Sequence, residues 1–308
     1  MFGIGKQYIK VDKLLTQIAI RYTNAAFTSA SLIPDLTVQK ESDKYRIYKK
    51  DGWFKGAPKK ADGAETAEAT LFYDEGTYSV YERAIKDLVT DRAVQNADAP
   101  VKPLSDTTEF LTEKINLSRE LDIFGLAVGT SGLNQSGYRK ALSAGTAWID
   151  GTAATILRDI SDGIIAVVKQ TMQKPNVMFV TTEVIEGLAL QAEVRDILKL
   201  QSTQMVTQMN PLPSLRGLNT VITDVMYDNS DTPGTEDFTY ALGNNVIIAF
   251  VKAGHPLNFG YNFTSRGFQV ARWRDEDREG EFVKTSKIYA PKITCLGAGY
   301  IFTTVKNV

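Results

Sequence analysis

Two runs of sequence decide the fold, Lys44-Tyr45-Arg46-Ile47-Tyr48 and Thr77-Tyr78-Ser79-Val80-Tyr81. Aromatic and β-branched residues alternate with charged or small ones in both, which is typical of strands. Leu36-Thr37-Val38 precedes them and Leu71-Phe72-Tyr73 leads into the second run, with a turn-forming, lysine-rich segment between. The pattern predicts a long β-hairpin with a polar tip.

The tip of this hairpin carries several lysines and two large aromatic residues. A two-stranded hairpin is marginal in water unless it packs on something, and large aromatic side chains at a projecting tip tend to be covered. The hairpin therefore either folds back on its own domain or lies on a neighbouring subunit, and we favour the neighbour. The candidate contact residues are Trp53, Phe54, Lys55, Lys59 and Lys60.

The same lysines and aromatics also have the composition of a surface that binds single-stranded nucleic acid. Acidic residues nearby weaken its field, namely Asp51, Asp62, Glu65 and Glu68. We therefore favour a solvated loop that docks on protein.

Helices are predicted after the hairpin. Ile85, Leu88 and Val89 have helical spacing, which predicts a helix over 82–98 that Pro100 and Pro103 end. A longer helix is predicted over 107–128, with Asp106 as N-cap and Gly129 as its stop. At about 1.5 Å per residue it would reach roughly 33 Å, enough to cross a whole domain.

The second half of the chain reads as a mixed α/β unit followed by strands. Expected helices lie at 156–171 and 184–198, and expected strands at 177–180, 217–225 and 244–251. The last third predicts a β-hairpin from 268–273 and 281–284, with a charged turn, and a final strand at 293–305.

The charged turn holds acidic and basic residues in alternation. Because its arginines neutralise its carboxylates, a metal or acid–base site is disfavoured, and a solvated turn or an ion-pair patch between subunits is expected. The candidate contact residues here are Arg272, Arg274, Asp275, Asp277 and Arg278.

Composition sets limits on function. The chain has 308 residues, 43% of them hydrophobic, and a formal net charge of −1. That composition is typical of a folded protein, and the balanced charge excludes a global field that attracts nucleic acid. No run of about 18 apolar residues exists, so no membrane partner is expected.

Few residues suited to catalysis are present. Cys295 and His255 are the single cysteine and histidine, so one chain cannot supply the ligands of a structural zinc site. His255 lies in Gly254-His255-Pro256, a turn-like setting. No phosphate-binding or nucleophile motif occurs. We predict no enzymatic activity, no catalytic residues, no cofactor and no metal.

In its order of parts the chain resembles the major capsid proteins of tailed bacteriophages, whose shell-forming fold is shared with encapsulins and the herpesvirus capsid floor. Three phrases carry the resemblance locally: Lys174-Pro175-Asn176-Val177-Met178-Phe179-Val180, Leu215-Arg216-Gly217-Leu218-Asn219-Thr220-Val221-Ile222 and Val270-Ala271-Arg272-Trp273-Arg274-Asp275-Glu276-Asp277-Arg278.

The resemblance implies an α+β capsid fold in five parts. They are an N-terminal arm at 1–34, an E-loop hairpin at 35–81, a peripheral domain with a spine helix at 82–151, an axial domain at 152–260, and a return to the peripheral-domain hairpin and C-terminal strand at 261–308.

The implied function is self-assembly into pentamers and hexamers that form an icosahedral shell around packaged double-stranded DNA. Implied partners are other copies of the chain, a scaffolding protein, a portal, a decoration protein and DNA bound non-specifically. The implied location is the virion, after assembly in the host cytoplasm. The alternatives are an encapsulin-like nanocompartment and a carboxylate-dependent hydrolase.

The chain departs from some members of the family in two features. No long N-terminal scaffolding region is evident, which implies a separate scaffold protein or a processed sequence. Some members join an E-loop lysine to a neighbour's asparagine. Lys55, Lys59 or Lys60 could supply the lysine, and Asn258 or Asn262 the acceptor, but no catalytic carboxylate is evident and we do not predict the bond.

Overall fold

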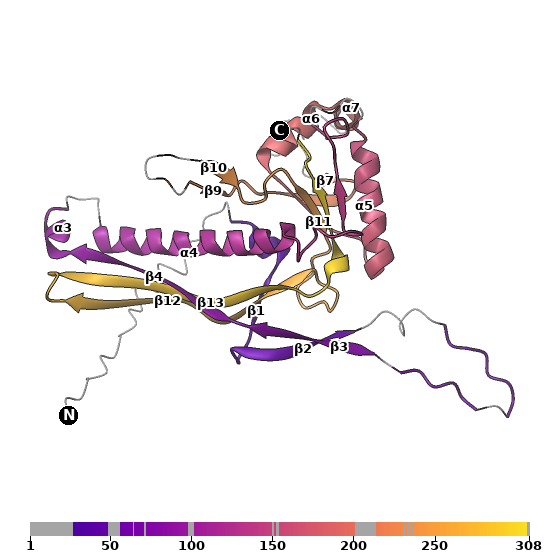
Figure 1. Ribbon diagram of the computed structural model, residues 1–308, viewed down its shortest axis with the longest axis horizontal. Helices are drawn as coiled ribbons and strands as arrows, with labels where there is room; N and C mark the ends of the chain where they lie inside the picture. Colours follow the sequence, from indigo (N-terminus) through magenta and orange to yellow (C-terminus); the bar gives the residue numbers. More distant parts are fainter. Residues whose placement is uncertain are drawn as a thin grey trace.

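The computed structural model describes residues 27–48, 56–63, 65–70, 72–97, 102–149, 151, 154–200, 214–230, 232, 235 and 237–306. Three parts are visible in Figure 1: a rounded α/β body, an elongated layer in which a long helix lies along a long sheet, and a two-stranded hairpin that projects away from both. None of the helices in these residues is long and apolar enough to cross a membrane.

The α/β body is built on a six-stranded mixed sheet. Its strands, in spatial order, are β5 (Arg139–Ala141), β14 (Gly299–Thr303), β11 (Val246–Ala249), β6 (Val177–Val180), β8 (Leu218–Ile222) and β7 (Ser214–Leu215). The pairs β14–β5 and β6–β8 are parallel and the others antiparallel.

Three helices belong to this body: α5 (Ile156–Thr171), α6 (Thr182–Leu190) and α7 (Ala192–Leu200). α5 packs closely on the sheet, because a Cβ at Gly163 would lie 2.8 Å from the Phe302 ring. The predictions for 156–171 and 177–180 are confirmed. The single helix predicted over 184–198 is wrong in its continuity, since Gln191 is extended and separates α6 from α7.

The elongated layer is a second sheet with the long helix on one face (Figure 1). Its strand order is β1 (Asp35–Thr37), β12 (Gly260–Asp275), β13 (Gly280–Ile293) and β4 (Tyr81–Thr90). β12 and β13 form the predicted charged hairpin, although both strands are much longer than the sequence indicated.

The helix predicted over 82–98 is wrong. Most of that segment is β4, and only α3 (Asp91–Gln95) is helical. Ile85, Leu88 and Val89 are spaced as in a helix, but β4 pairs with β13 continuously from Tyr81 to Thr90. That long-range pairing outweighs the local helical spacing. The β-branched residues of the segment also favour a strand.

The long helix, α4 (Pro103–Val128), is confirmed, but it begins earlier than predicted. Pro103 occupies the first helical position, where a missing N–H costs nothing. Asp106 is not the N-cap; its carboxylate accepts the backbone N–H of Lys102 at 3.2 Å, inside the first turn. The helix ends before Gly129 as expected, and its 26 residues span about 39 Å.

The projecting hairpin consists of β2 (Ser42–Tyr48) and β3 (Tyr73–Ser79), paired in antiparallel register. Its base rests on β12, where the Tyr78 ring stacks on Phe263 with centroids 4.3 Å apart. The described residues also form smaller elements: α2 (Ser29–Leu32), β9 (Met226–Asp228) paired with β10 (Phe238–Tyr240), and η3 (Leu296–Ala298).

Candidate assembly surfaces

The outer part of the projecting hairpin stands clear of the body. Every described residue from 56 to 70 is exposed, Lys59 and Lys60 among them. Lys60 donates to the Thr66 hydroxyl at 2.9 Å, which joins the two sides of the segment. Trp53, Phe54 and Lys55 lie outside the described residues. A long exposed segment of this kind has surface available for a neighbouring molecule.

The hairpin is stiffened where it leaves the body. Lys44 and Glu75 face each other across the strands at 2.7 Å, and this contact raises the pKa of the lysine. The Tyr45 ring covers Gly76 so closely that a Cβ there would lie 2.5 Å from the ring. Tyr45 also packs 5.7 Å from Phe263, and burial raises its pKa. These contacts hold the two projecting strands together and fix the base of the hairpin against β12.

The charged turn between β12 and β13 forms the opposite end of the molecule. Arg274 binds Asp91 of α3 through two hydrogen bonds, at 3.1 and 2.8 Å, and Glu276 at 2.9 Å. The arginine lowers the pKa of Asp91, and the acids raise that of Arg274. Asp275 lies 3.9 Å from Arg278, whereas Asp277 is exposed in the turn.

The structure thus gathers all five charged candidates at one tip and pairs most of them within their own chain. Asp91, which the sequence analysis did not single out, is the main partner of Arg274. The expectation that the turn is internally neutralised is confirmed. A role in contacts between subunits stays a prediction.

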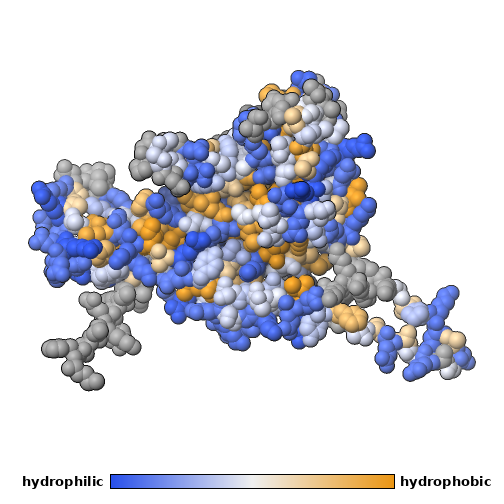
Figure 2. Space-filling view, viewed as in Figure 1, coloured by the Kyte–Doolittle hydropathy of each residue, from blue (hydrophilic) through white to orange (hydrophobic). Residues whose placement is uncertain are grey.

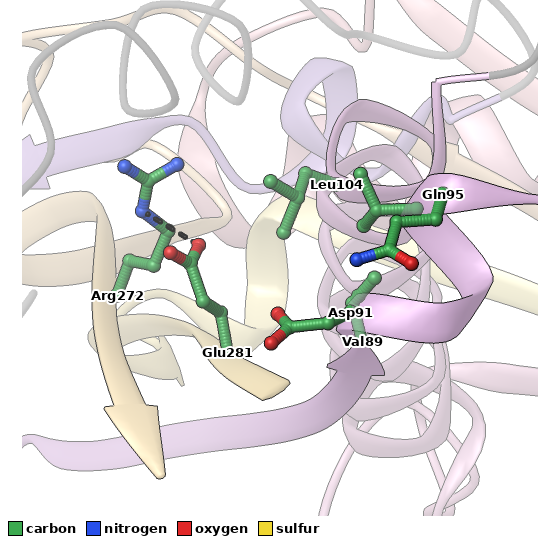
Figure 3. A pocket seen from close by; sticks show the side chains of 7 residues that line it. Val89, Asp91, Gln95, Leu104, Arg272 and Glu281 are labelled. Atoms are coloured by element: carbon green, nitrogen blue, oxygen red, sulfur yellow. Dashed lines mark ion pairs between the residues drawn. The ribbon is translucent and has the colours of Figure 1, made fainter. Parts of the chain in front are cut away.

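A small pocket of about 230 Å³ lies beside this tip (Figure 3). Its lining residues are Val89, Asp91, Val94, Gln95, Leu104, Arg272 and Glu281. Both acids have arginine partners: Asp91 binds Arg274, and Glu281 lies 3.2 Å from Arg272. Two carboxylates held by arginines are poorly placed to act as an acid–base pair.

A larger groove, of about 480 Å³, runs between β4 and α4. Apolar side chains such as Ile85 and Leu121 line it together with charged ones. Arg83, which lines the groove, makes a bidentate ion pair with Asp122, with hydrogen bonds of 2.9 and 2.6 Å. The Asp122 carboxylate also accepts a hydrogen bond from the Tyr289 hydroxyl at 2.9 Å. Burial raises the pKa of Tyr289, so the hydroxyl stays a donor.

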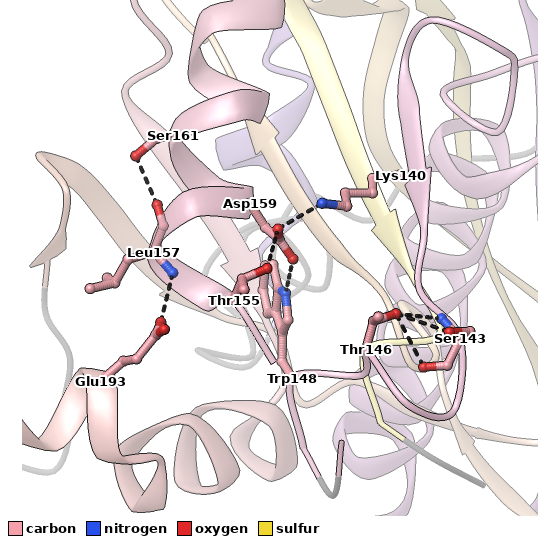
Figure 4. A network of polar contacts seen from close by, with 9 residues as sticks. All are labelled: Lys140, Ser143, Thr146, Trp148, Thr155, Leu157, Asp159, Ser161 and Glu193. Atoms are coloured by element: carbon pink, nitrogen blue, oxygen red, sulfur yellow. Dashed lines mark hydrogen bonds and ion pairs between the residues drawn. The ribbon is translucent and has the colours of Figure 1, made fainter. Parts of the chain in front are cut away.

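A buried polar network ties the connector after α4 to the α/β body (Figure 4). The Asp159 carboxylate, on α5, is 1% exposed. It accepts the Trp148 indole N–H at 2.9 Å, the Lys140 amine at 2.7 Å and the Thr155 hydroxyl at 2.9 Å. Three bonds satisfy the buried charge, so this network is structural.

Large apolar residues are exposed on several elements. Leu190 at the end of α6 is 77% exposed and Phe238 of β10 is 60% exposed. Figure 2 shows apolar surface gathered over the middle of this face, with hydrophilic surface over the projecting hairpin and the charged tip.

The single histidine is a turn residue, as predicted. His255 packs edge-on against Phe250 with centroids 5.2 Å apart, and its Nδ1 accepts the backbone N–H of Leu257 at 3.1 Å. Within the part of the chain that the structure describes, no group of three or more His, Cys, Asp or Glu residues could hold a metal ion.

Known proteins of similar sequence and structure are phage and shell proteins. The major capsid protein of Burkholderia phage BcepMu is 24% identical over 314 residues, covering 96% of this chain and 97% of the relative. A phage-related protein from Bordetella bronchiseptica, known from a crystal structure, has a TM-score of 0.75 at 15% identity, covering 97% and 98% of the two chains. No family model matches the chain.

Two assembled shells are also similar. The capsid of the native GTA particle has a TM-score of 0.59 at 12% identity, covering 91% of this chain and 90% of that one. The SrpI encapsulin of Synechococcus elongatus has a TM-score of 0.55 at 12% identity, covering 97% of each chain. The chain therefore has the α+β shell fold of phage capsids and encapsulins, as the resemblance implied.

Proposed function

We propose that this chain is a major capsid protein, which assembles with copies of itself into pentamers and hexamers that form an icosahedral shell around double-stranded DNA. The observation that carries the proposal is the similarity, over almost the full length of both chains, to the BcepMu major capsid protein. The agreement in fold with two shell-forming proteins supports it independently.

The shape of the molecule suits a subunit that contacts several others. The projecting hairpin and the charged turn lie at opposite ends of the molecule, and the two ends differ in shape (Figure 1). Contacts between unlike surfaces build rings when the rotation closes. In this proposal the five hairpin candidates and the five charged-turn candidates lie between subunits.

Further partners belong to the same proposal. A scaffolding protein and a portal would act during assembly, a decoration protein would bind outside, and packaged DNA would contact the interior without sequence preference. The formal charge of −1 fits weak DNA contact, because sequence-independent binding depends on lysine and arginine neutralising phosphates. The shell would be assembled in the host cytoplasm and found in the virion.

Negative-stain electron microscopy after a sizing column tests the proposal. We expect closed shells or sheets of hexamers from the expressed chain, alone or with its candidate scaffold. A monomer or dimer under every condition would overturn the proposal.

A nanocompartment is the second candidate, favoured by the similarity to the SrpI encapsulin. The contents of purified shells separate the two, since a nanocompartment holds protein cargo and a phage capsid holds DNA. A hydrolase is not favoured, because the acids of the tip pocket are each held by an arginine.

A further inference from the structure

One buried carboxylate holds the segment through which the chain enters the body. Glu120, on α4, is 2% exposed. Its two oxygens accept the backbone N–H of Ser29 at 2.9 and 3.1 Å. Ser29 belongs to residues 28–35, which join the N-terminal part of the chain to β1 and are called here the entry segment.

The rest of the entry segment is held mainly by apolar contacts. Leu32 and Ile33 are fully buried in the cluster that contains Ile123 and Phe124 of α4. At the segment's first residue, the Thr28 hydroxyl lies 2.8 Å from that of Thr223. These contacts are independent of pH, so Glu120 is the titratable group that lies against the start of the segment.

Ionic contacts form at the far end of the segment. Asp35 accepts from Arg119 at 2.9 Å and from Asn262 at 2.6 Å, and lies 3.9 Å from the Lys287 amine. Burial raises the pKa of the Glu120 carboxyl and outweighs the hydrogen bonds from Ser29 and the neighbouring Arg119, which favour its charged form. The ion pair between Arg83 and Asp122 is the next charged pair along α4.

We propose that the entry segment is a releasable latch whose docking on α4 is controlled by the charge on Glu120. Ionised Glu120 is costly in a buried site, whereas the released segment would leave it in water. The docked state therefore holds the proton more tightly than the released one. By linkage, acid favours docking and rising pH favours release.

Hydrogen exchange of the full-length chain tests the latch. It is measured by mass spectrometry at about pH 5 and about pH 7, both below the pKa of Lys287, and corrected for intrinsic rates. We expect protection of the amides from Ser29 to Asp35 to fall several-fold at the higher pH. Glu120→Gln keeps an acceptor for the Ser29 N–H without a charge. Its protection should be high and equal at both pH values.

Glu109→Gln is the matched control, since it makes the same chemical change on the partly exposed surface of the same helix. It should behave like the unchanged chain. Protection that is independent of pH in the unchanged chain, or lost at both pH values in Glu120→Gln, would overturn the latch. The test follows a single segment of one chain and does not depend on assembly. The latch can therefore be wrong while shells still form, and it can be right in a chain that forms no shells.

Discussion

The six-stranded sheet and the layer under α4 bury their inner faces in different ways. The sheet packs beneath α5 with an interior that is largely apolar, in which Met178, Ile248 and Phe302 are fully buried. The cluster between α4 and the long hairpin contains far fewer buried apolar residues: Leu111, Val270 and Val283.

Polar groups fill much of the remaining space under α4. Thr108, Thr112 and Asn116 of the helix are buried, and so are Thr285 and Lys287 of β13. Thr108 and Thr112 bond back to their own helix, at 2.7 Å each. The α/β body therefore depends on close packing, and the long layer on hydrogen bonds and ion pairs, so the layer should be the more sensitive to pH.

The largest expected effect is a cavity in the apolar body. Phe302→Ala should lower the free energy of unfolding by about 3–5 kcal/mol, because the ring is fully buried and its removal leaves a cavity. Urea denaturation followed by circular dichroism measures it. Phe72→Ala, at a residue 55% exposed, is the control and should change little; equal losses would refute the packing difference.

Next in size is the network on Asp159. Asp159→Ala removes the acceptor of Trp148 and Lys140, so the free energy of unfolding should fall by about 2–4 kcal/mol. Asp162→Ala, at an exposed position of the same helix, is the matched control. A loss no larger than the control's would mean that the connector is held by packing alone.

A pH effect is expected in the long layer. Burial lowers the pKa of Lys287 to about 8, so above that value the folded chain has released a proton that the unfolded chain keeps. Stability should therefore rise with pH above about 8, towards the ordinary lysine range. Lys287→Met should remove this rise. Denaturation profiles over that range measure it, and parallel profiles for both proteins would contradict the assignment.

The smallest effect on stability is expected at the charged tip. Arg274 and Asp91 are substantially exposed, and exposed ion pairs contribute little. Arg274→Ala should leave the denaturation midpoint within error. If the same variant weakens shell formation, the tip lies between subunits; unchanged assembly would remove Arg274 from the contact candidates.

Local sequence predicted most elements of the α/β body and the hairpin β2–β3, because their patterns had a single interpretation. It failed at β4, because Ile85, Leu88 and Val89 suit a helix as well as a strand. Pairing with β13, almost two hundred residues away, determines that the segment is a strand. The start of α4 was missed because Pro103 was taken as a stop when it is the first helical residue.

The candidate site was predictable only in part. The charges of the turn were visible as a local cluster, whereas Asp91 joins it from 183 residues away. Glu120 gave no signal, since nothing in its own helix indicates that it receives the N–H of Ser29, 91 residues distant. Contacts of this kind require the tertiary fold.

Assembly of a hairpin deletion tests the central claim, that the compact parts fold by themselves while the projecting hairpin joins subunits. The measurement is negative-stain electron microscopy of the unchanged chain and of a variant that lacks Gly52 to Gly63, with the unfolding midpoint of each. We predict shells from the unchanged chain, and from the deletion a folded, soluble subunit that forms none. Shells from both, or a deletion that unfolds, would contradict the account.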